Sequence, residues 1–291
     1  MSSSPRRLSD RRDGELIENL DSMHLIMPLI YPNRCDNEAY ISQRIDLTAA
    51  DAYIEKRNSA RPIFKFTIFH LIVAAILKVI VLRPKLNRFI CNKNMYQRKE
   101  ITASFIVKKK FNDTSEEGMA FIHAKENSTL DSLHDELYKQ ITHVRGGGTN
   151  STDESMDLFS KLPRLLLKIA VAIVRWLDRH GWVPKAFIAD DPYYASVILS
   201  NLGSIKLQSG YHHLTNWGTT SLFCVVGEMK KRPFFREDGS YEFKNSIDLG
   251  LTIDERLADG YYYSKSVRML KYILEHPQCL EKPLSTPVDY E

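Results

Sequence analysis

The sequence has few cysteines, almost no excess of charge of one sign, and no apolar run long enough to cross a membrane. Its four cysteines, at 35, 91, 224 and 279, lie far apart, so neither a disulfide framework nor a zinc site is indicated. Forty Lys and Arg against 36 Asp and Glu give a net charge of +4, which is too small to indicate a nucleic-acid-binding protein. We therefore expect a cytoplasmic protein with no metal site and no nucleic-acid partner.

The two longest apolar runs do not predict membrane spans. Residues 68–82 contain His70 and Lys78, and residues 162–177 contain three basic side chains. A spanning helix needs about 20 consecutive apolar residues. The charged N-terminus is not followed by an apolar segment of the kind that a secretory signal requires.

The order of predicted elements is that of a mixed α/β domain. Residues 1–28 are polar and are expected to form a poorly ordered arm, and residues 29–291 a single domain. Apolar periodicity predicts helices at 51–58, 66–82, 130–145, 156–180 and 261–275. Runs rich in β-branched and aromatic residues predict strands at 101–111, 196–202, 219–227 and 246–253, with hairpins at 89–96 and 234–244. We expect a large mixed sheet flanked by helices.

The predicted helix at 156–180 has two distinct faces. Arg164, Lys168 and Arg175 lie on one side, whereas Leu165 and Trp176 belong to a wide apolar side. Such a helix either lies on a membrane surface or docks on a sheet or a second subunit. We favour docking, and peripheral membrane contact is the less favoured alternative.

A charged turn near the C-terminus joins an apolar strand to the last helix. The turn, at 254–260, reads Asp-Glu-Arg-Leu-Ala-Asp-Gly, and the helix ends in Leu-Glu-His-Pro at 274–277. This stretch resembles the signature of dihydrolipoyl acyltransferase catalytic domains of 2-oxoacid dehydrogenase complexes, which share their fold with chloramphenicol acetyltransferase. That signature is a strand, Asp-His-Arg, two variable residues, Asp-Gly, and a helix ending in Leu-Glu-x-Pro.

Three further segments resemble the same family in the expected order. They are the apolar helix with Pro-Lys-Leu-Asn at 66–89, the Ser-Asn-Leu-Gly strand at 196–203, and the apolar strand ending in glycine at 222–227. The resemblance implies a chloramphenicol-acetyltransferase-like fold, a homotrimer with the active site between subunits, and transfer of an acyl group from a thioester. We expect acyl-CoA or CoA as substrate, with no tightly bound cofactor; the acceptor is not identified.

The resemblance assigns roles to several residues. Ser200 matches the hydroxyl that stabilises the oxyanion, and Asp259-Gly260 match the end of the signature. In the family this aspartate is structural and pairs with an arginine near the start of the domain. Arg34 is the candidate for that partner, with a plain surface arginine as the alternative.

The family's catalytic histidine is replaced here by Glu255. A carboxylate has an unperturbed pKa of about 4.3, against about 6.5 for imidazole, so it is the weaker base unless burial raises its pKa. Glu255 is therefore either an atypical general base or a non-catalytic residue. His212 and His213 lie in the loop after the Ser200 strand, where one of them either lines the site or is a loop residue bonded to backbone.

Two function classes follow from these residues. The first is an acyltransferase that uses Ser200 and Glu255; the second is a catalytically degenerate trimeric scaffold or binding module. We expect no lipoyl domain or subunit-binding domain before the catalytic domain, so within a dehydrogenase complex another chain is expected to supply the lipoyl arm.

Overall fold

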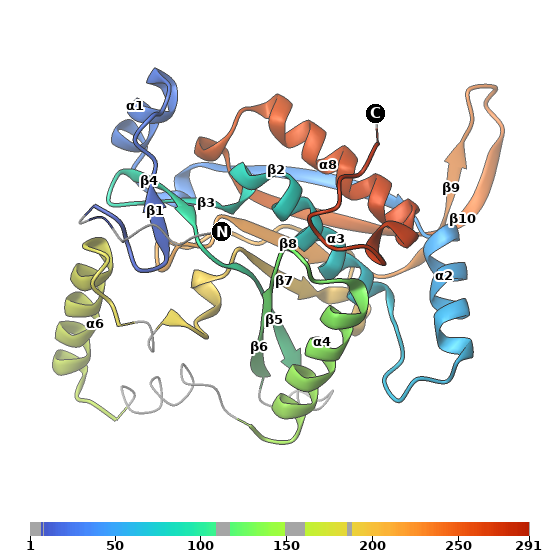
Figure 1. The fold of residues 1–291 in the computed structure, drawn as a ribbon, viewed down its shortest axis with the longest axis horizontal. Helices are drawn as coiled ribbons and strands as arrows, with labels where there is room; N and C mark the ends of the chain where they lie inside the picture. The colour runs from blue at the N-terminus through green and yellow to red at the C-terminus, as the bar shows by residue number, and fades with distance from the viewer. Residues whose placement is uncertain (1–6, 8, 109–116, 149–160, 185–187, 291) are drawn as a thin grey trace.

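Seven strands of the described residues form one mixed sheet at the centre of the molecule (Figure 1). The computed structural model describes residues 7, 9–108, 117–148, 161–184 and 188–290. The strand order is β2-β10-β8-β7-β5-β6, and β9 pairs with the first half of β10. β7 runs parallel to both β5 and β8, and the other pairings are antiparallel. The bounds are β2 (Glu38–Asp46), β5 (Ile101–Lys108), β6 (Glu117–Ala124), β7 (Val197–Asn201), β8 (Leu222–Val226), β9 (Lys230–Phe235) and β10 (Tyr241–Asp254).

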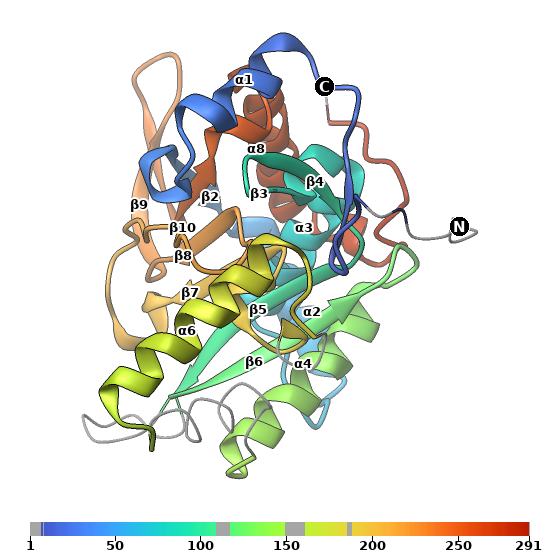
Figure 2. The ribbon, with the colours of Figure 1, turned by 90° about the vertical axis from the view of Figure 1, so that its left-hand side faces the viewer.

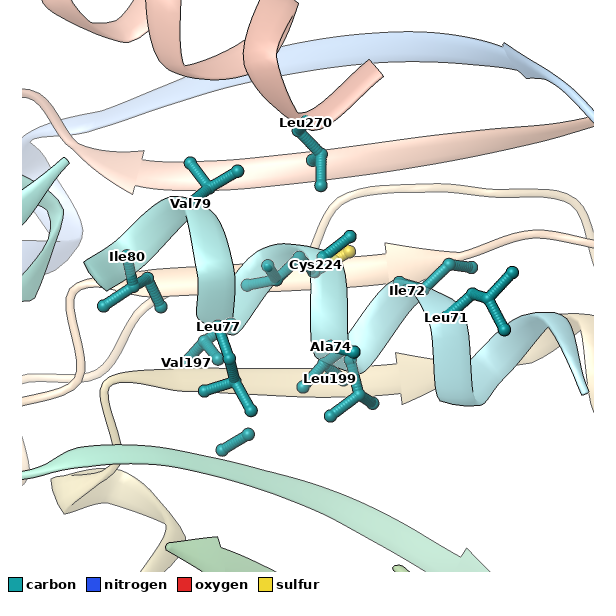
Figure 3. Close-up of a cluster of buried hydrophobic side chains, with 14 of the residues drawn as sticks. Leu71, Ile72, Ala74, Leu77, Val79, Ile80, Val197, Leu199, Cys224 and Leu270 are labelled. Atoms are coloured by element: carbon teal, nitrogen blue, oxygen red, sulfur yellow. The ribbon is translucent and has the colours of Figure 1, made fainter. Parts of the chain in front are cut away.

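Four helices pack together with one face of this sheet into the main core. They are α2 (Thr48–Ser59), α3 (Ile68–Leu82), α4 (Leu130–Arg145) and α8 (Gly260–Glu275). Figure 3 shows α3 lying along the strands, with Leu77 and Ala74 near Val197 and Leu199. Residues 70–80 of α3 are all buried, and each buried Leu or Ile contributes about 1.5–3 kcal/mol through removal from water. This helix therefore anchors the domain.

The opposite face of the sheet is approached by the chain between β7 and β8. Alternation places Ile198, Phe223 and Val225 on this face, where they pack with Leu214. Two close approaches require glycine. A Cβ at Gly203 would lie 2.4 Å from the Gly227 carbonyl oxygen, and one at Gly250 would lie 1.9 Å from that of Gly210. The Ser-Asn-Leu-Gly segment thus needs its glycine to follow the sheet.

The N-terminal segment is ordered over its described residues, so the expected disordered arm is wrong there. β1 (Gly14–Leu16) pairs with β4 (Asn94–Arg98), which also pairs with β3 (Arg88–Cys91), and α1 (Ser22–Ile30) follows. Arg11 fixes this segment through ion pairs with Asp13 and Asp178, both at 2.8 Å. Strand pairing and buried charge therefore order a segment whose composition is polar.

The mixed α/β architecture with a large sheet flanked by helices is confirmed. The predicted strand at 246–253 and the second half of the hairpin form one continuous strand, β10. The helix predicted at 156–180 is α6 (Arg164–Arg179), and residues 156–160 lie outside the described residues. None of the residues of α6 is buried, so the expectation that it docks on the sheet is wrong. Docking on a second subunit stays a prediction.

Candidate functional site

The charged turn joins β10 to α8 at one end of the large sheet (Figure 1). Asp254 ends the strand, and Glu255–Leu257 form a single 3-10 turn with Glu255 exposed. Asp259 then caps α8, because its carboxylate accepts a hydrogen bond of 2.8 Å from the Tyr262 amide. That bond holds the pKa of Asp259 below its usual value. The motif therefore folds as a tight connection between strand and helix.

Glu255 lines a cavity of about 590 Å³, which we call the Glu255 cavity. Its walls come from α1, β2, the end of β10, the charged turn and α8, and apolar side chains surround the polar ones. Asp259 and Gly260 line it too, so the structure brings these two predicted residues together with Glu255. The lining is Met23, His24, Met27, Ala39, Ile41, Gln43, Ile253, Glu255, Arg256, Ala258, Asp259, Gly260, Tyr263, Ser264, Val267 and Arg268.

His24 is a residue of this cavity that the sequence analysis missed. Its Nδ1 lies 2.5 Å from Oδ2 of Asp21, and its side chain is 15% exposed. Asp21 also caps α1 by accepting a hydrogen bond from the His24 amide at 3.1 Å. This bond lowers the pKa of Asp21 most, and the bond to the His24 ring lowers it further. A carboxylate on Nδ1 fixes the ring and leaves Nε2 available as a proton acceptor. The only sequence signal is an Asp-x-x-His spacing, which has no specific meaning by itself.

Arg34 is buried, but its acidic neighbour is Asp254 and not Asp259. Arg34 Nε lies 3.8 Å from Oδ2 of Asp254, and the guanidinium donates to three backbone carbonyls. Arg256 binds both oxygens of the same carboxylate, at 2.8 and 2.6 Å. Burial lowers the pKa of Arg34 despite this carboxylate. The predicted pairing of Arg34 with Asp259 is therefore wrong.

The strand register explains the correction. Arg34 lies just before β2, and β2 places Glu38 opposite Asp254 at the end of β10. The arginine consequently reaches the last residue of the strand, whereas the Asp259 carboxylate is already used at the start of the helix. Arg34 and Asp259 therefore take part in separate interactions, and their structural roles stay predictions.

Ser200 lies at the far end of the sheet from Glu255. It is half-buried near the end of β7, opposite Val225 of β8, which is opposite Gly250 of β10. Glu255 follows Gly250 by five residues along the strand direction, which corresponds to roughly 17 Å. One copy of the chain therefore does not bring the Ser200 hydroxyl to the Glu255 cavity.

The two loop histidines lie over the sheet face that carries Ser200. The His212 ring stacks on Phe223 with centroids 4.2 Å apart, and on the His213 ring at 4.6 Å. Phe223 is opposite Ile198, two residues before Ser200 on the same side of β7. Both histidines are exposed, and neither lines the Glu255 cavity. If they act in a site, they belong to its Ser200 half.

Two absences among the described residues bear on other functions. In the ranges that the structure describes, no three or more His, Cys, Asp or Glu side chains lie close enough together to hold a metal ion. No helix in those ranges has the length and apolar character that crossing a membrane requires.

The comparisons with known proteins agree with the motif. The family model of the 2-oxoacid dehydrogenases acyltransferase (catalytic domain) matches residues 189–281, which hold Ser200, Glu255 and Asp259. No curated protein sequence is significantly similar to the chain.

Three solved structures have a similar fold. A probable dihydrolipoamide acetyltransferase from Listeria monocytogenes has a TM-score of 0.59 at 14% identity, covering 90% of this chain and 95% of that one. The cubic core of a pyruvate dehydrogenase multienzyme complex has a TM-score of 0.54 at 14% identity, covering 91% and 93%. A chloramphenicol acetyltransferase has a TM-score of 0.52 at 13% identity, covering 90% and 99%.

The fold indicated by the sequence motifs, and the resemblance behind it, are thereby confirmed. The chain has the fold shared by chloramphenicol acetyltransferase and the dihydrolipoamide acetyltransferases, and its residues 189–281 match the acyltransferase catalytic-domain family of the 2-oxoacid dehydrogenases.

Proposed function

We propose that this protein transfers an acyl group from a thioester, with acyl-CoA as the favoured donor, to a small thiol, hydroxyl or amine acceptor. One observation carries the proposal: His24, whose Nδ1 is bound by Asp21, lines the same cavity as Glu255, at the turn where the resembled family holds its catalytic histidine. An imidazole whose Nδ1 is held by a carboxylate can accept a proton at Nε2. His24 can therefore supply the function that the Glu255 position lacks.

In the proposed reaction, the sulfur, oxygen or nitrogen atom of the acceptor attacks the thioester carbonyl carbon. His24 Nε2 accepts the proton that this atom loses. The negative charge that develops on the carbonyl oxygen is stabilised by a hydrogen bond from the Ser200 hydroxyl. The carbon–sulfur bond then breaks, and the sulfur leaves as the free thiol after it takes the proton from His24. The alternative, suggested by the motif, is that Glu255 is the base.

The proposed assembly is a homotrimer with each site formed by two copies. Ser200 and Glu255 lie roughly 17 Å apart along the strands of one copy, so the hydroxyl must come from a neighbour. The solved relative in the cubic core of a dehydrogenase complex also works as part of an assembly. A Cβ at Gly260 would meet nothing within 4 Å in one copy, which leaves that edge of the cavity open.

The test measures CoA released from acetyl-CoA by the purified full chain, with thiol and amine acceptors present. His24→Gln should lower the turnover about 10²–10⁴-fold, which is the usual contribution of a general base. Glu255→Gln should lower it much less. The matched control is His123→Gln, because His123 is exposed on β6 and lies outside the cavity.

The opposite order of effects would assign the base to Glu255 and refute the assignment to His24. The enzyme proposal would be refuted if the wild-type protein released no CoA and did not bind acetyl-CoA saturably. The degenerate scaffold would then be the remaining function.

A further inference from the structure

α6 presents an apolar surface that the rest of the described chain does not cover. Figures 1 and 2 show the helix at the outer edge of the molecule, on the side of the small sheet and α1. Leu165 is 69% exposed, and Ile173 and Trp176 are more than half exposed. Its C-terminal end is held to the rest of the described chain, where Leu177 packs on a small buried cluster and Asp178 binds Arg11. A helix with so little burial needs another surface to stabilise its apolar side.

A stripe of cations borders this apolar side. Arg164, Lys168, Arg175 and Arg179 are spaced by four, seven and four residues, which places them within an arc of about 60° on the helix. All four are exposed, and over the stretches that the structure describes none of them has an ion pair. Trp176 lies beside the stripe at the edge of the apolar arc. This order of cation, tryptophan and aliphatic side chains is typical of a helix in a membrane interface.

The stripe continues into a polar cavity of about 250 Å³, which we call the basic cavity. Arg175 and Arg179 line it from α6, Lys93 from the turn between β3 and β4, and the buried Arg34 and Arg256 from the sheet edge. Arg34 and Arg256 share the buried carboxylate of Asp254, so the excess positive charge of the lining comes from Arg175, Arg179 and Lys93. The one acidic residue in the lining, Asp178, is bound by Arg11. The cavity therefore attracts an anion.

Lys93 gives a second indication that the cavity is built for a charge. Asn92 and Lys93 have φ angles of 48° and 66°, a left-handed pair of the type that favours glycine at the second position. A lysine is held there although glycine would suit the backbone better. Lys93 is among the residues that line the basic cavity.

We propose that α6 lies in the surface of a membrane containing anionic phospholipids. Its aliphatic and tryptophan side chains enter the acyl region, the basic stripe contacts phosphates, and the basic cavity takes the phosphate of one headgroup. An anionic bilayer offers phosphates along the whole stripe, so a single surface meets the four cations and the apolar side of the helix together. The inference does not depend on acyl transfer, since it rests on other residues.

The experiment is flotation of the full chain with vesicles of phosphatidylcholine alone or mixed with phosphatidylglycerol. We expect binding to the mixed vesicles only, weakened by salt because screening acts on exposed charges. Ile173→Glu and Lys168→Glu should each weaken binding about tenfold or more. Ile205→Glu is the matched control, because Ile205 is similarly exposed elsewhere and should bind normally.

Lys93→Gly tests the contribution of the basic cavity to vesicle binding independently of the contribution of α6. It relieves the left-handed backbone, so the fold should be at least as stable, yet binding to anionic vesicles should fall severalfold. Equal binding to neutral vesicles would refute the role of the basic stripe and cavity. Absence of vesicle binding would overturn the proposal, and if Ile173→Glu then also lowers the sedimenting mass, α6 is a subunit contact instead.

Discussion

At the scale of single residues, the charged turn is held by one carboxylate shared between two buried arginines. Asp254 is fully buried, Arg256 binds both of its oxygens, and Arg34 lies 3.8 Å away. The Nη atoms of Arg34 donate to backbone carbonyls of two separate segments, the loop at Thr215 and Gly218 and the strand at Ile90. This cluster fixes the end of β10, and thereby the position of Glu255.

Asp254→Asn should destabilise the protein strongly, because it leaves two buried guanidinium groups without a counter-charge. Removal of one partner from a buried ion pair typically costs about 3–5 kcal/mol in the free energy of unfolding. Urea unfolding of the variant and the wild type measures this. Asp259→Ala is the comparison: it removes an exposed helix cap and should cost clearly less. A larger loss for Asp259→Ala would contradict the cluster described here.

The residues of the candidate site were predictable only in part. Glu255, Asp259 and Gly260 are close in sequence, so the motif places them together. His24 lies about 230 residues earlier, and only the fold brings α1 against the turn. The predicted pairing of Arg34 with Asp259 was wrong for a similar reason. The register between β2 and β10 decides which carboxylate the arginine contacts, and the order of motifs in a sequence does not determine that register.

At the scale of elements, the strongly periodic helices were predicted and the irregular ones were not. α3, α4 and α8 have sustained apolar spacing, and their predicted bounds agree with the structure within two residues. α1 was missed because it contains Pro28, normally a helix breaker, and exposes apolar side chains that burial does not explain. β2 was missed because few of its residues are buried.

The start of α3 makes stability depend on pH. His70 Nδ1 accepts a hydrogen bond from the Thr67 amide at 2.9 Å, which requires the neutral ring. Burial, aided by the neighbouring His134, lowers the pKa of His70 to about 3. The unfolded chain has a value of about 6.5, so it binds the proton first as the pH falls. The stabilisation is therefore complete above about pH 6.5 and is lost progressively toward pH 3.

His70→Gln should flatten this dependence, since glutamine can accept the same amide hydrogen bond and does not titrate. Between pH 6 and 4, the wild type should lose up to about 1.4 kcal/mol per pH unit through this one residue. Urea unfolding at several pH values gives the slopes. Equal slopes for the two proteins would show that His70 is not responsible.

At the scale of the whole molecule, the Glu255 cavity is open on the side where the proposed trimer would place a second copy of the chain. α1 exposes Met23, Leu25, Ile26, Leu29 and Ile30 beside the Glu255 cavity. Ser200 lies at the other end of the sheet, so a ring of copies could join the two ends repeatedly. Location in the cytoplasm and acyl-CoA as donor stay predictions at this scale.

Sedimentation at micromolar concentration should give about three times the chain mass of 33.6 kDa. We expect the exposed apolar residues of α1 to supply the contact between copies, so Leu29→Glu should lower the sedimenting mass. A wild-type protein that sediments cleanly as a monomer would contradict the trimer and the shared site.

The shared site itself is tested most directly by mixing two inactive variants. Ser200→Ala and His24→Gln damage opposite halves of the proposed site, so co-expression should produce trimers in which some sites receive an intact half from each neighbour. With random assembly, about a quarter of the sites would be intact, and acyl transfer from acetyl-CoA should return to about that fraction of the wild-type rate. Activity that stays at the level of the separate variants, in trimers shown to contain both, would contradict a site built from two copies.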